Sequence, residues 1–213
     1  MKDKPIIKVM PQGPYIVKGL DKLTQGDGKK VPVSAPIVLC RCGQSSTKPF
    51  CDGTHTTLDF DDSKHPDREP RELKTYQGKE VTIHDDRGIC SHASYCTEGA
   101  PGVFIPENSP WIDPDGESKE TIINTIRRCP SGALSYTVDG VKYTEFFPEE
   151  EIVVSKDGPY EVRGSIELDN PDQPTLIEQY VLCRCGKSKN HPFCSGLHAD
   201  ENFRDDGTVE KEG

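Results

Sequence analysis

The chain has 213 residues, of which 32% are hydrophobic, and it contains 18 prolines, 19 glycines and nine cysteines. So little apolar material argues against one large core, and small domains with thin cores usually depend on disulfides or bound metals. The formal net charge of −10 argues against nucleic-acid binding, which needs clustered cations.

The first 60 residues are predicted to form short strands that lead into a metal-binding loop. Apolar runs at 6–9 and 15–17 flank a Gly-Pro turn, and a third run at 37–39 comes directly before the loop. The loop has the spacing C-x-C-x8-C-x3-H, and its four donors are Cys40, Cys42, Cys51 and His55.

The donor types in this loop suit zinc or an iron–sulfur cluster. Structural zinc sites usually draw their cysteine pairs from C-x2-C to C-x4-C, so a C-x-C pair is unusual for zinc. Two cysteines one residue apart point the same way along an extended chain, and four donors match the terminal ligands of a 2Fe–2S cluster. We therefore favour a cluster, with structural zinc as the alternative.

Residues 61–75 are charged and proline-rich and are predicted to be a linker, and residues 76–147 are predicted to be a separate domain. Three cysteines of this domain, Cys90, Cys96 and Cys129, are its candidate metal ligands. Its expected elements are a strand at 80–84, a helix at 119–128 and two strands at 133–138 and 141–143 joined by an Asp-Gly turn.

The last unit, residues 148–213, repeats the first. Apolar runs at 152–154, 160–162 and 180–182 precede a loop with the same donor spacing, and Phe60 and Phe203 lie five residues after the last donor of each loop. The second set of donors is Cys183, Cys185, Cys194 and His198. Two such units could bury their faces against each other.

The first loop resembles the signature of the CDGSH iron–sulfur (NEET) family, C-x-C-x2-[ST]-x3-P-x-C-D-G-[ST]-H. The match is at Cys40, Cys42, Ser45, Pro49, Cys51, Asp52, Gly53, Thr54 and His55. This resemblance implies a 2Fe–2S cluster with three cysteine ligands and one histidine ligand, and paired clusters. In the second loop Ser195 replaces the aspartate and Leu197 replaces the Ser/Thr, while all four ligands remain. We expect these changes to affect the stability and pH response of the second cluster.

The middle domain resembles the divergent single-cluster 4Fe–4S domain that accompanies CDGSH motifs in some bacterial proteins. The resemblance rests on Cys90, His92, Cys96, Phe104, Trp111 and the segment 129–134. Ala93 stands where a fourth cysteine would lie, so the resemblance implies either a 3Fe–4S cluster or a 4Fe–4S cluster whose fourth iron is capped by His92, water or a thiol. The alternative is a fold in which the cysteines are merely buried thiols.

The remaining histidines are expected to have no ligand role. We expect His191 on the surface, and His65 and His84 on the surface or on a strand. A histidine ligand must be neutral to bind metal, so the hypothesis follows that acid releases the first cluster through His55.

These observations predict an α+β fold, rich in short strands, in which two CDGSH units form a pseudo-dimer with a ferredoxin-like domain between them. We expect an electron-transfer protein rather than an enzyme, with two 2Fe–2S clusters and one 3Fe–4S or 4Fe–4S cluster. The alternatives are a cluster carrier or a redox or pH sensor, a zinc-stapled interaction module, and a redox subunit of a larger enzyme.

The predicted setting of the protein follows from its cysteines and charge. An odd number of cysteines excludes complete disulfide pairing, and metal ligation implies a reducing, cytoplasmic compartment. The start of the chain lacks the apolar region of a signal peptide, and no apolar run is long enough for a membrane span. The partner is expected to be a redox protein, basic where it meets the acidic residues of 61–150, and the chain is expected to be a monomer.

Overall fold

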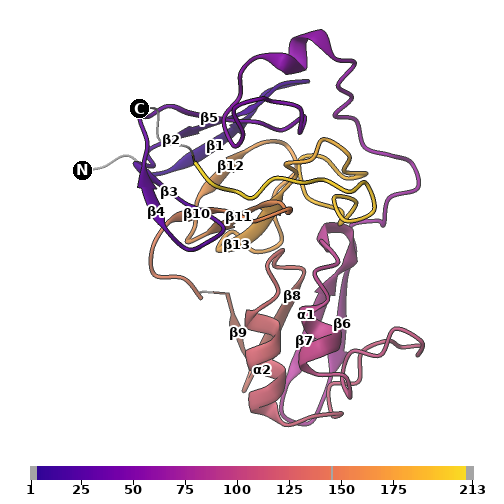
Figure 1. The fold of residues 1–213 in the computed structure, drawn as a ribbon. Coiled ribbons are helices and arrows are strands. Elements are labelled where there is room, and N and C mark those ends of the chain that lie inside the picture. Colours follow the sequence, from indigo (N-terminus) through magenta and orange to yellow (C-terminus); the bar gives the residue numbers. More distant parts are fainter. Residues whose placement is uncertain (1–3, 145, 210–213) are drawn as a thin grey trace.

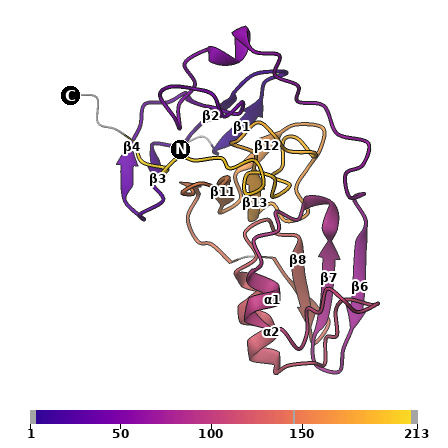
Figure 2. The same ribbon diagram turned by 45° about the vertical axis from the view of Figure 1, so that its right-hand side comes forward.

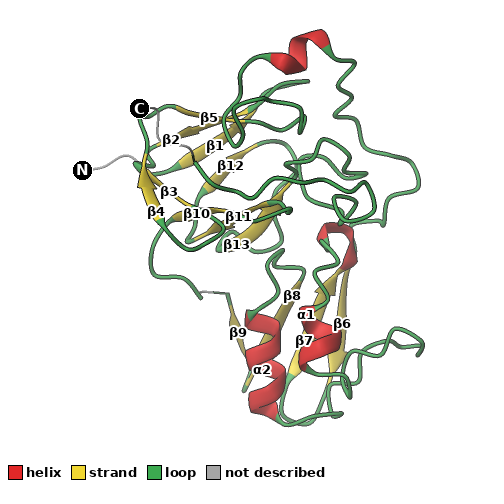
Figure 3. Ribbon diagram, viewed as in Figure 1, coloured by secondary structure: helices red, strands yellow, loops and turns green. Residues whose placement is uncertain are grey.

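The computed structural model describes residues 4–144 and 146–209, which form three β-sheets and few helical segments. Figure 1 shows two sheets, built from the first and last thirds of the chain, above a smaller body built from the middle third. Figure 3 shows that long loops join most of the strands. The fold is therefore α+β and rich in short strands, as the sequence predicts.

The two upper sheets contain strands from both ends of the chain. The first third supplies β1 (Ile6–Val9), β2 (Tyr15–Lys18), β3 (Lys22–Thr24), β4 (Lys30–Pro32) and β5 (Ile37–Leu39). The last third supplies β10 (Glu151–Val154), β11 (Tyr160–Arg163), β12 (Glu167–Asp169) and β13 (Gln179–Leu182). The predicted strands that precede each loop are confirmed, whereas β3, β4 and β12 were not predicted.

A strand of each repeat joins the sheet of the other repeat. One sheet has the order β12-β1-β2-β5 and the other has the order β13-β11-β10-β3-β4. Strand β1 pairs in parallel with β12, and β10 pairs in parallel with β3. The buried side chains of both sheets belong to one apolar core, so the two repeats fold as one body.

Hairpins with the same register occur in both repeats. Val9 faces Tyr15 across β1 and β2, and Val154 faces Tyr160 across β10 and β11. Along β2 and β11 the buried and less buried side chains alternate, because successive side chains of a strand point to opposite faces. The alternation brings both tyrosines into the core.

The middle body is a four-stranded antiparallel sheet with two helices. Its strands, in the order β6-β7-β8-β9, are β6 (Leu73–Gln77), β7 (Thr82–Asp86), β8 (Leu134–Val138) and β9 (Val141–Tyr143). Strand β6 begins inside the segment predicted to be a linker. The helices are α1 (Tyr95–Gly99) and α2 (Lys119–Arg127), which lie along the sheet in Figure 2.

Helix α2 has a clear start and stop, and the predicted helix is confirmed. The Ser118 side chain accepts a hydrogen bond from the backbone of Thr121, as an N-cap does. Ile122 and Ile126 pack against β7 and β8 in a second apolar core. None of the helices in the described ranges combines the length and apolarity that a bilayer crossing requires.

Candidate metal centres

The loop after β5 brings its four predicted donors together as two pairs. The sulfurs of Cys40 and Cys42 are 3.8 Å apart, and the sulfur of Cys51 is 3.4 Å from Nδ1 of His55. Backbone hydrogen bonds from Cys40 to Pro49 O (2.8 Å) and from Cys51 to Val38 O (2.9 Å) close the loop.

The loop after β13 has the same geometry. The sulfurs of Cys183 and Cys185 are 3.8 Å apart, and the sulfur of Cys194 is 3.4 Å from Nδ1 of His198. The backbone of Cys183 donates to Pro192 O at 2.8 Å, in the place of the bond from Cys40 to Pro49.

These separations fit one metal ion at each pair. Two sulfurs about 2.3 Å from a tetrahedral metal are about 3.8 Å apart, and a sulfur and a nitrogen are about 3.5 Å apart. In the ranges that the structure describes, no three His, Cys, Asp or Glu side chains converge on a single ion position. Two pairs in each loop suit the two irons of a 2Fe–2S cluster better than one zinc ion.

Some of the candidate ligand thiols carry protons that metal binding must displace. A hydrogen bond between the paired sulfurs lowers the pKa of one thiol, to about 6 for Cys42 and about 5 for Cys183. Burial raises the pKa of Cys194 to about 12 and also raises that of Cys51. Burial lowers the pKa of His198, which keeps its ring neutral. Metal binding therefore releases protons and depends on pH.

The two loops differ in their exposure. Cys194 is 3% exposed, whereas Cys51 is only half-buried. Asp52 is exposed, and its carboxylate accepts hydrogen bonds from the backbones of Ser46 (2.8 Å) and Thr54 (3.0 Å). These bonds from Thr54 and Ser46 hold the pKa of Asp52 well below its usual range.

Ser195 takes over part of the role of the aspartate. Its hydroxyl accepts a hydrogen bond from the backbone of Lys189 at 3.1 Å. This bond corresponds to the one that Asp52 accepts from Ser46. Asp52 also caps the backbone that follows it through its bond with Thr54, whereas Ser195 preserves only the bond with the residue six positions before it.

The arginine between the first two cysteines of each loop is a structural residue that the sequence reasoning missed. Arg41 is 2% exposed, donates to Gly13 O (2.8 Å) and Met10 O (2.7 Å), and forms an ion pair with Asp62. Its guanidinium lies 5.2 Å from the ring centre of Phe60.

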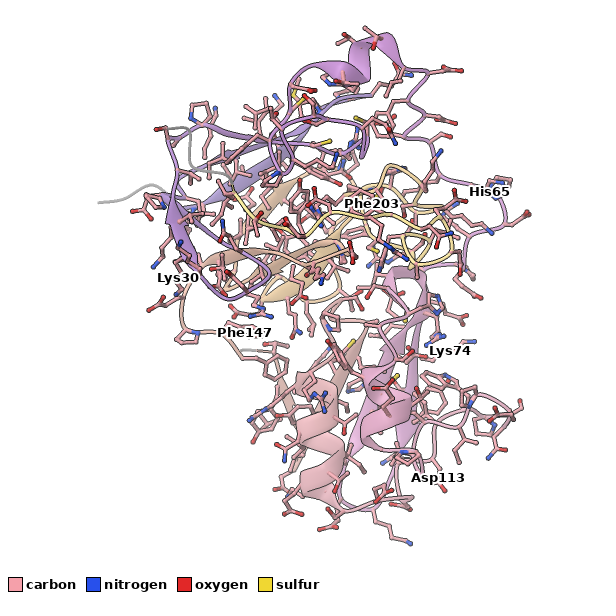
Figure 4. All side chains as sticks on the ribbon, in the orientation of Figure 1. Lys30, His65, Lys74, Asp113, Phe147 and Phe203 are labelled. Atoms are coloured by element: carbon pink, nitrogen blue, oxygen red, sulfur yellow. The ribbon has the colours of Figure 1, made fainter. Side chains whose placement is uncertain are left out.

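The second loop repeats this arrangement around a second buried arginine. Arg184 donates to Gly158 O (2.9 Å) and Ser155 O (2.6 Å), pairs with Asp205 and lies 5.0 Å from the ring centre of Phe203. Figure 4 shows Phe203 in the middle of the upper body. The signal in the sequence was the recurrence of arginine, phenylalanine and aspartate at equal offsets.

Each repeat supports the metal loop of the other repeat. The hydroxyl of Tyr15 donates to Cys183 O and Pro192 O, both at 3.0 Å. The hydroxyl of Tyr160 donates to Cys40 O and Pro49 O, both at 2.9 Å. The two rings meet edge to face, with their centres 6.0 Å apart.

The two loops also lie directly against each other. A Cβ atom at Gly43 would lie 2.4 Å from Cys185 O, and one at Gly186 would lie 2.3 Å from Cys42 O. Both glycines have positive φ, at 76° and 77°. Only glycine fits at these two positions, because any side chain would be strained at this φ and would collide with the backbone of the facing loop.

The three cysteines of the middle body line one cavity of about 550 Å³. Cys90 follows a short 3-10 helix (Arg87–Ile89), Cys96 lies on α1, and Cys129 follows α2. One water takes up roughly 30 Å³, so the cavity has room for a multi-atom group. All three predicted ligands therefore lie around one cavity.

Charged and polar groups surround these thiols. Nη1 of Arg87 donates to the sulfur of Cys90 at 3.6 Å, and the backbone of His92 donates to the same sulfur at 3.4 Å. Burial raises the pKa of Cys90 to about 11 and also raises that of Cys96. His92 and Ala93 line the cavity as well, so His92 remains a candidate cap.

Asp85 is a buried acid in this cavity that the sequence reasoning missed. It is 1% exposed; its Oδ2 accepts a hydrogen bond from Trp111 Nε1 at 3.1 Å, and its Oδ1 has no partner within the described ranges. Burial raises the pKa of Asp85 to about 6. Its position two residues after Ile83 on β7, hence on the same inward face, was the available signal.

The expectation that His191 lies on the surface is wrong. It is 4% exposed, its ring meets Phe60 edge to face at 5.7 Å, and neither ring nitrogen has a hydrogen-bond partner in the part of the chain that the structure describes. Packing against the other repeat, which a local pattern cannot show, buries it. His84 lies on β7 and His65 is exposed, as expected (Figure 4).

Comparison with known proteins supports the repeats and the middle domain. The family model described as "Iron-binding zinc finger CDGSH type" matches residues 12–56 and 157–199, and "Divergent 4Fe-4S mono-cluster" matches residues 76–139. "Uncharacterized protein YjdI" of Escherichia coli (strain K12) is 35% identical over 63 residues, which are 30% of this chain and 83% of the relative.

A mammalian relative is also similar over part of the chain. "CDGSH iron-sulfur domain-containing protein 1" of Rattus norvegicus is 32% identical over 78 residues, which are 34% of this chain and 64% of that protein. No solved structure gives a significant match.

Proposed function

Because the chain belongs to the CDGSH iron–sulfur family and carries a divergent 4Fe–4S mono-cluster domain, we propose that it is an electron-transfer protein with three centres. The repeats hold two 2Fe–2S clusters, on Cys40, Cys42, Cys51 and His55 and on Cys183, Cys185, Cys194 and His198. The ferredoxin-like middle domain holds one 3Fe–4S or 4Fe–4S cluster on Cys90, Cys96 and Cys129.

The observation that carries this proposal is the pairing of donors at 3.8 Å and 3.4 Å in both loops. When bound, such clusters accept and release single electrons. The chain supplies the ligands, buries most of their sulfurs and holds both loops rigidly through the glycine contact and the crossed tyrosines. A rigid site limits the rearrangement that accompanies each electron.

Iron, acid-labile sulfide and EPR of anaerobically purified protein test the proposal. About seven or eight irons per chain, with a 2Fe–2S signal after reduction and a 3Fe or 4Fe signal, support it. About four irons would leave the two repeats loaded and the middle domain empty. Stoichiometric zinc without sulfide would replace the proposal by an interaction module.

A cluster carrier or sensor is the second candidate, and the exposure of the first loop favours it. Cys51 and His55 are only partly buried, so an acceptor protein could reach them. Mixing loaded protein with a metal-free acceptor and following its cluster absorbance separates the two functions. A carrier transfers the cluster, whereas an electron carrier retains it through repeated reduction and oxidation.

We also propose that the chain works as a cytoplasmic monomer with a redox protein as its partner, and that it has no catalytic site of its own. Ligation by all nine cysteines, which leaves none for disulfides, favours a reducing compartment. The two metal loops contact each other within one chain. Pairing of the loops therefore does not require a second copy of the protein, which supports the monomer. Sedimentation of the loaded protein measures the oligomeric state directly.

A further inference from the structure

The middle body contacts the second metal loop through residues next to its own ligands. The side chain of Asn190 donates to Gly88 O at 2.5 Å, two residues before Cys90. A Cβ atom at Gly196 would lie 3.0 Å from Ser91 O and 3.1 Å from Cβ of His92. The backbone between Cys194 and His198 therefore rests on the backbone after Cys90.

A second contact joins the strand that leads into this loop to the third ligand of the middle body. The side chain of Gln179, the first residue of β13, donates to Cys129 O. A Cβ atom at Gly132 would lie 2.2 Å from Gln179 O, so these backbones also touch.

The first metal loop meets the second loop instead. Gly43 lies on Cys185 and Gly186 lies on Cys42, in backbone contact on both sides. The first loop is also the more exposed of the two, with Cys51 half-buried where Cys194 is buried. The donor sets thus follow one another in the order middle body, second loop and first loop, as the vertical arrangement of these segments in Figures 1 and 2 shows.

We propose that the second loop is an internal relay, in which the contact of Ser91 and His92 with Gly196 carries electrons between the middle cavity and the repeats, and that the first loop is the exit. This inference rests on the proposed electron-transfer function and adds a fixed order to it. One electron enters at the middle cavity from a one-electron donor protein, oxidising the donor. It leaves beside Cys51 and His55 to a one-electron acceptor protein, which is reduced, and no bond is formed or broken.

The exposure of the two ends supports this direction. Cys51 and His55 are only partly buried, so an acceptor protein can approach the first loop. The cavity is open to a donor, because His92, Ser94 and Tyr95 at its rim are exposed.

EPR of the fully reduced protein tests the order, because neighbouring unpaired spins split and broaden each other's signals. Cys194→Ala and Cys51→Ala remove ligands at equivalent positions of the two loops and are matched variants. Iron analysis and circular dichroism first establish that each variant has lost one cluster and kept its fold. We expect Cys194→Ala to abolish the splitting of the middle signal and Cys51→Ala to retain it.

The relay is overturned if both variants lose the splitting of the middle signal equally, or if Cys51→Ala alone loses it. If Cys194→Ala does not fold, Asn190→Ala takes its place, with Thr47→Ala as the control at the equivalent, exposed position of the first loop. A smaller splitting in Asn190→Ala alone supports the relay, and unchanged splitting overturns it. Failure of the proposed function is distinct and is seen in the wild type: a zinc-loaded protein gives no signal on reduction, and a cluster carrier transfers its cluster to a metal-free acceptor instead of retaining it through repeated reduction and oxidation.

Discussion

Replacing Asp85 by asparagine tests whether burial of the Asp85 carboxylate beside the middle cavity costs folding free energy. The carboxylate is 1% exposed and accepts a single hydrogen bond, from Trp111 at 3.1 Å. Asparagine keeps the shape and an oxygen for Trp111 but removes the buried charge. Since ionisation of a buried carboxylate costs free energy, we expect the variant to be more stable than the wild type at neutral pH.

The magnitude follows from the shift in pKa. An unfolded aspartate has a pKa of about 3.9, whereas burial raises the pKa of Asp85 to about 6 in the folded chain. Below pH 4 both states are protonated, and Asp85 contributes nothing to pH dependence. Stability is lost as the pH rises from about 4 to 6, and above pH 6 the full cost of about 3 kcal/mol applies. An anionic cluster in the same cavity increases this cost.

Urea denaturation of the loaded protein under anaerobic conditions, at several pH values from 5 to 8, measures the difference. We expect Asp85→Asn to gain stability over the wild type as the pH rises across this range. The control is Asp86→Asn, because the neighbouring carboxylate is paired with Arg71 at 3.0 Å and should lose stability instead. A difference between Asp85→Asn and wild type that does not change with pH refutes the buried-charge argument.

Three further predictions concern the repeats. His55→Cys should keep its visible cluster absorbance to lower pH than the wild type, because the histidine that acid would displace from the metal is no longer a ligand. Equal loss of absorbance by the variant and the wild type in a pH series excludes this explanation. Tyr160→Phe removes the hydroxyl that donates to Cys40 O and one of the two donors to Pro49 O, and it should cost about 1–3 kcal/mol in urea denaturation; no loss of stability contradicts the crossed support. Arg184→Met leaves Asp205 unpaired and should cost about 3–5 kcal/mol, whereas an exposed control such as Arg204→Met should change the midpoint little.

Local patterns in the sequence were enough to identify the candidate ligands and to predict most strands. The apolar runs before Cys40 and Cys183 form β5 and β13, and the helix predicted at 119–128 is α2, which ends at Arg127. The donor spacing alone indicated two equal loops. These features depend on residues that are close together in the chain.

The features that the sequence did not reveal depend on contacts between distant segments. Strand β1 pairs with β12, about 160 residues away, and three-residue strands such as β3 and β12 carry too little periodicity to be recognised. His191 was misplaced for the same reason, because a distant residue, Phe60 of the other repeat, packs against its ring. Asp85 directly follows the strand predicted at 80–84, and the sequence does not show that a cavity lies beside its side chain.

The departure of the second loop from the CDGSH signature can be understood from its neighbours. Asp52 is exposed to solvent, whereas Ser195 precedes Gly196, which rests on Ser91 and His92 close to Cys90. A carboxylate at position 195 would bring a negative charge toward the thiolates of the middle body and raise the cost of adding an electron there. The serine avoids that charge and still accepts the bond from Lys189. The same substitution that weakens the match to the signature therefore suits a loop that faces another metal site instead of solvent.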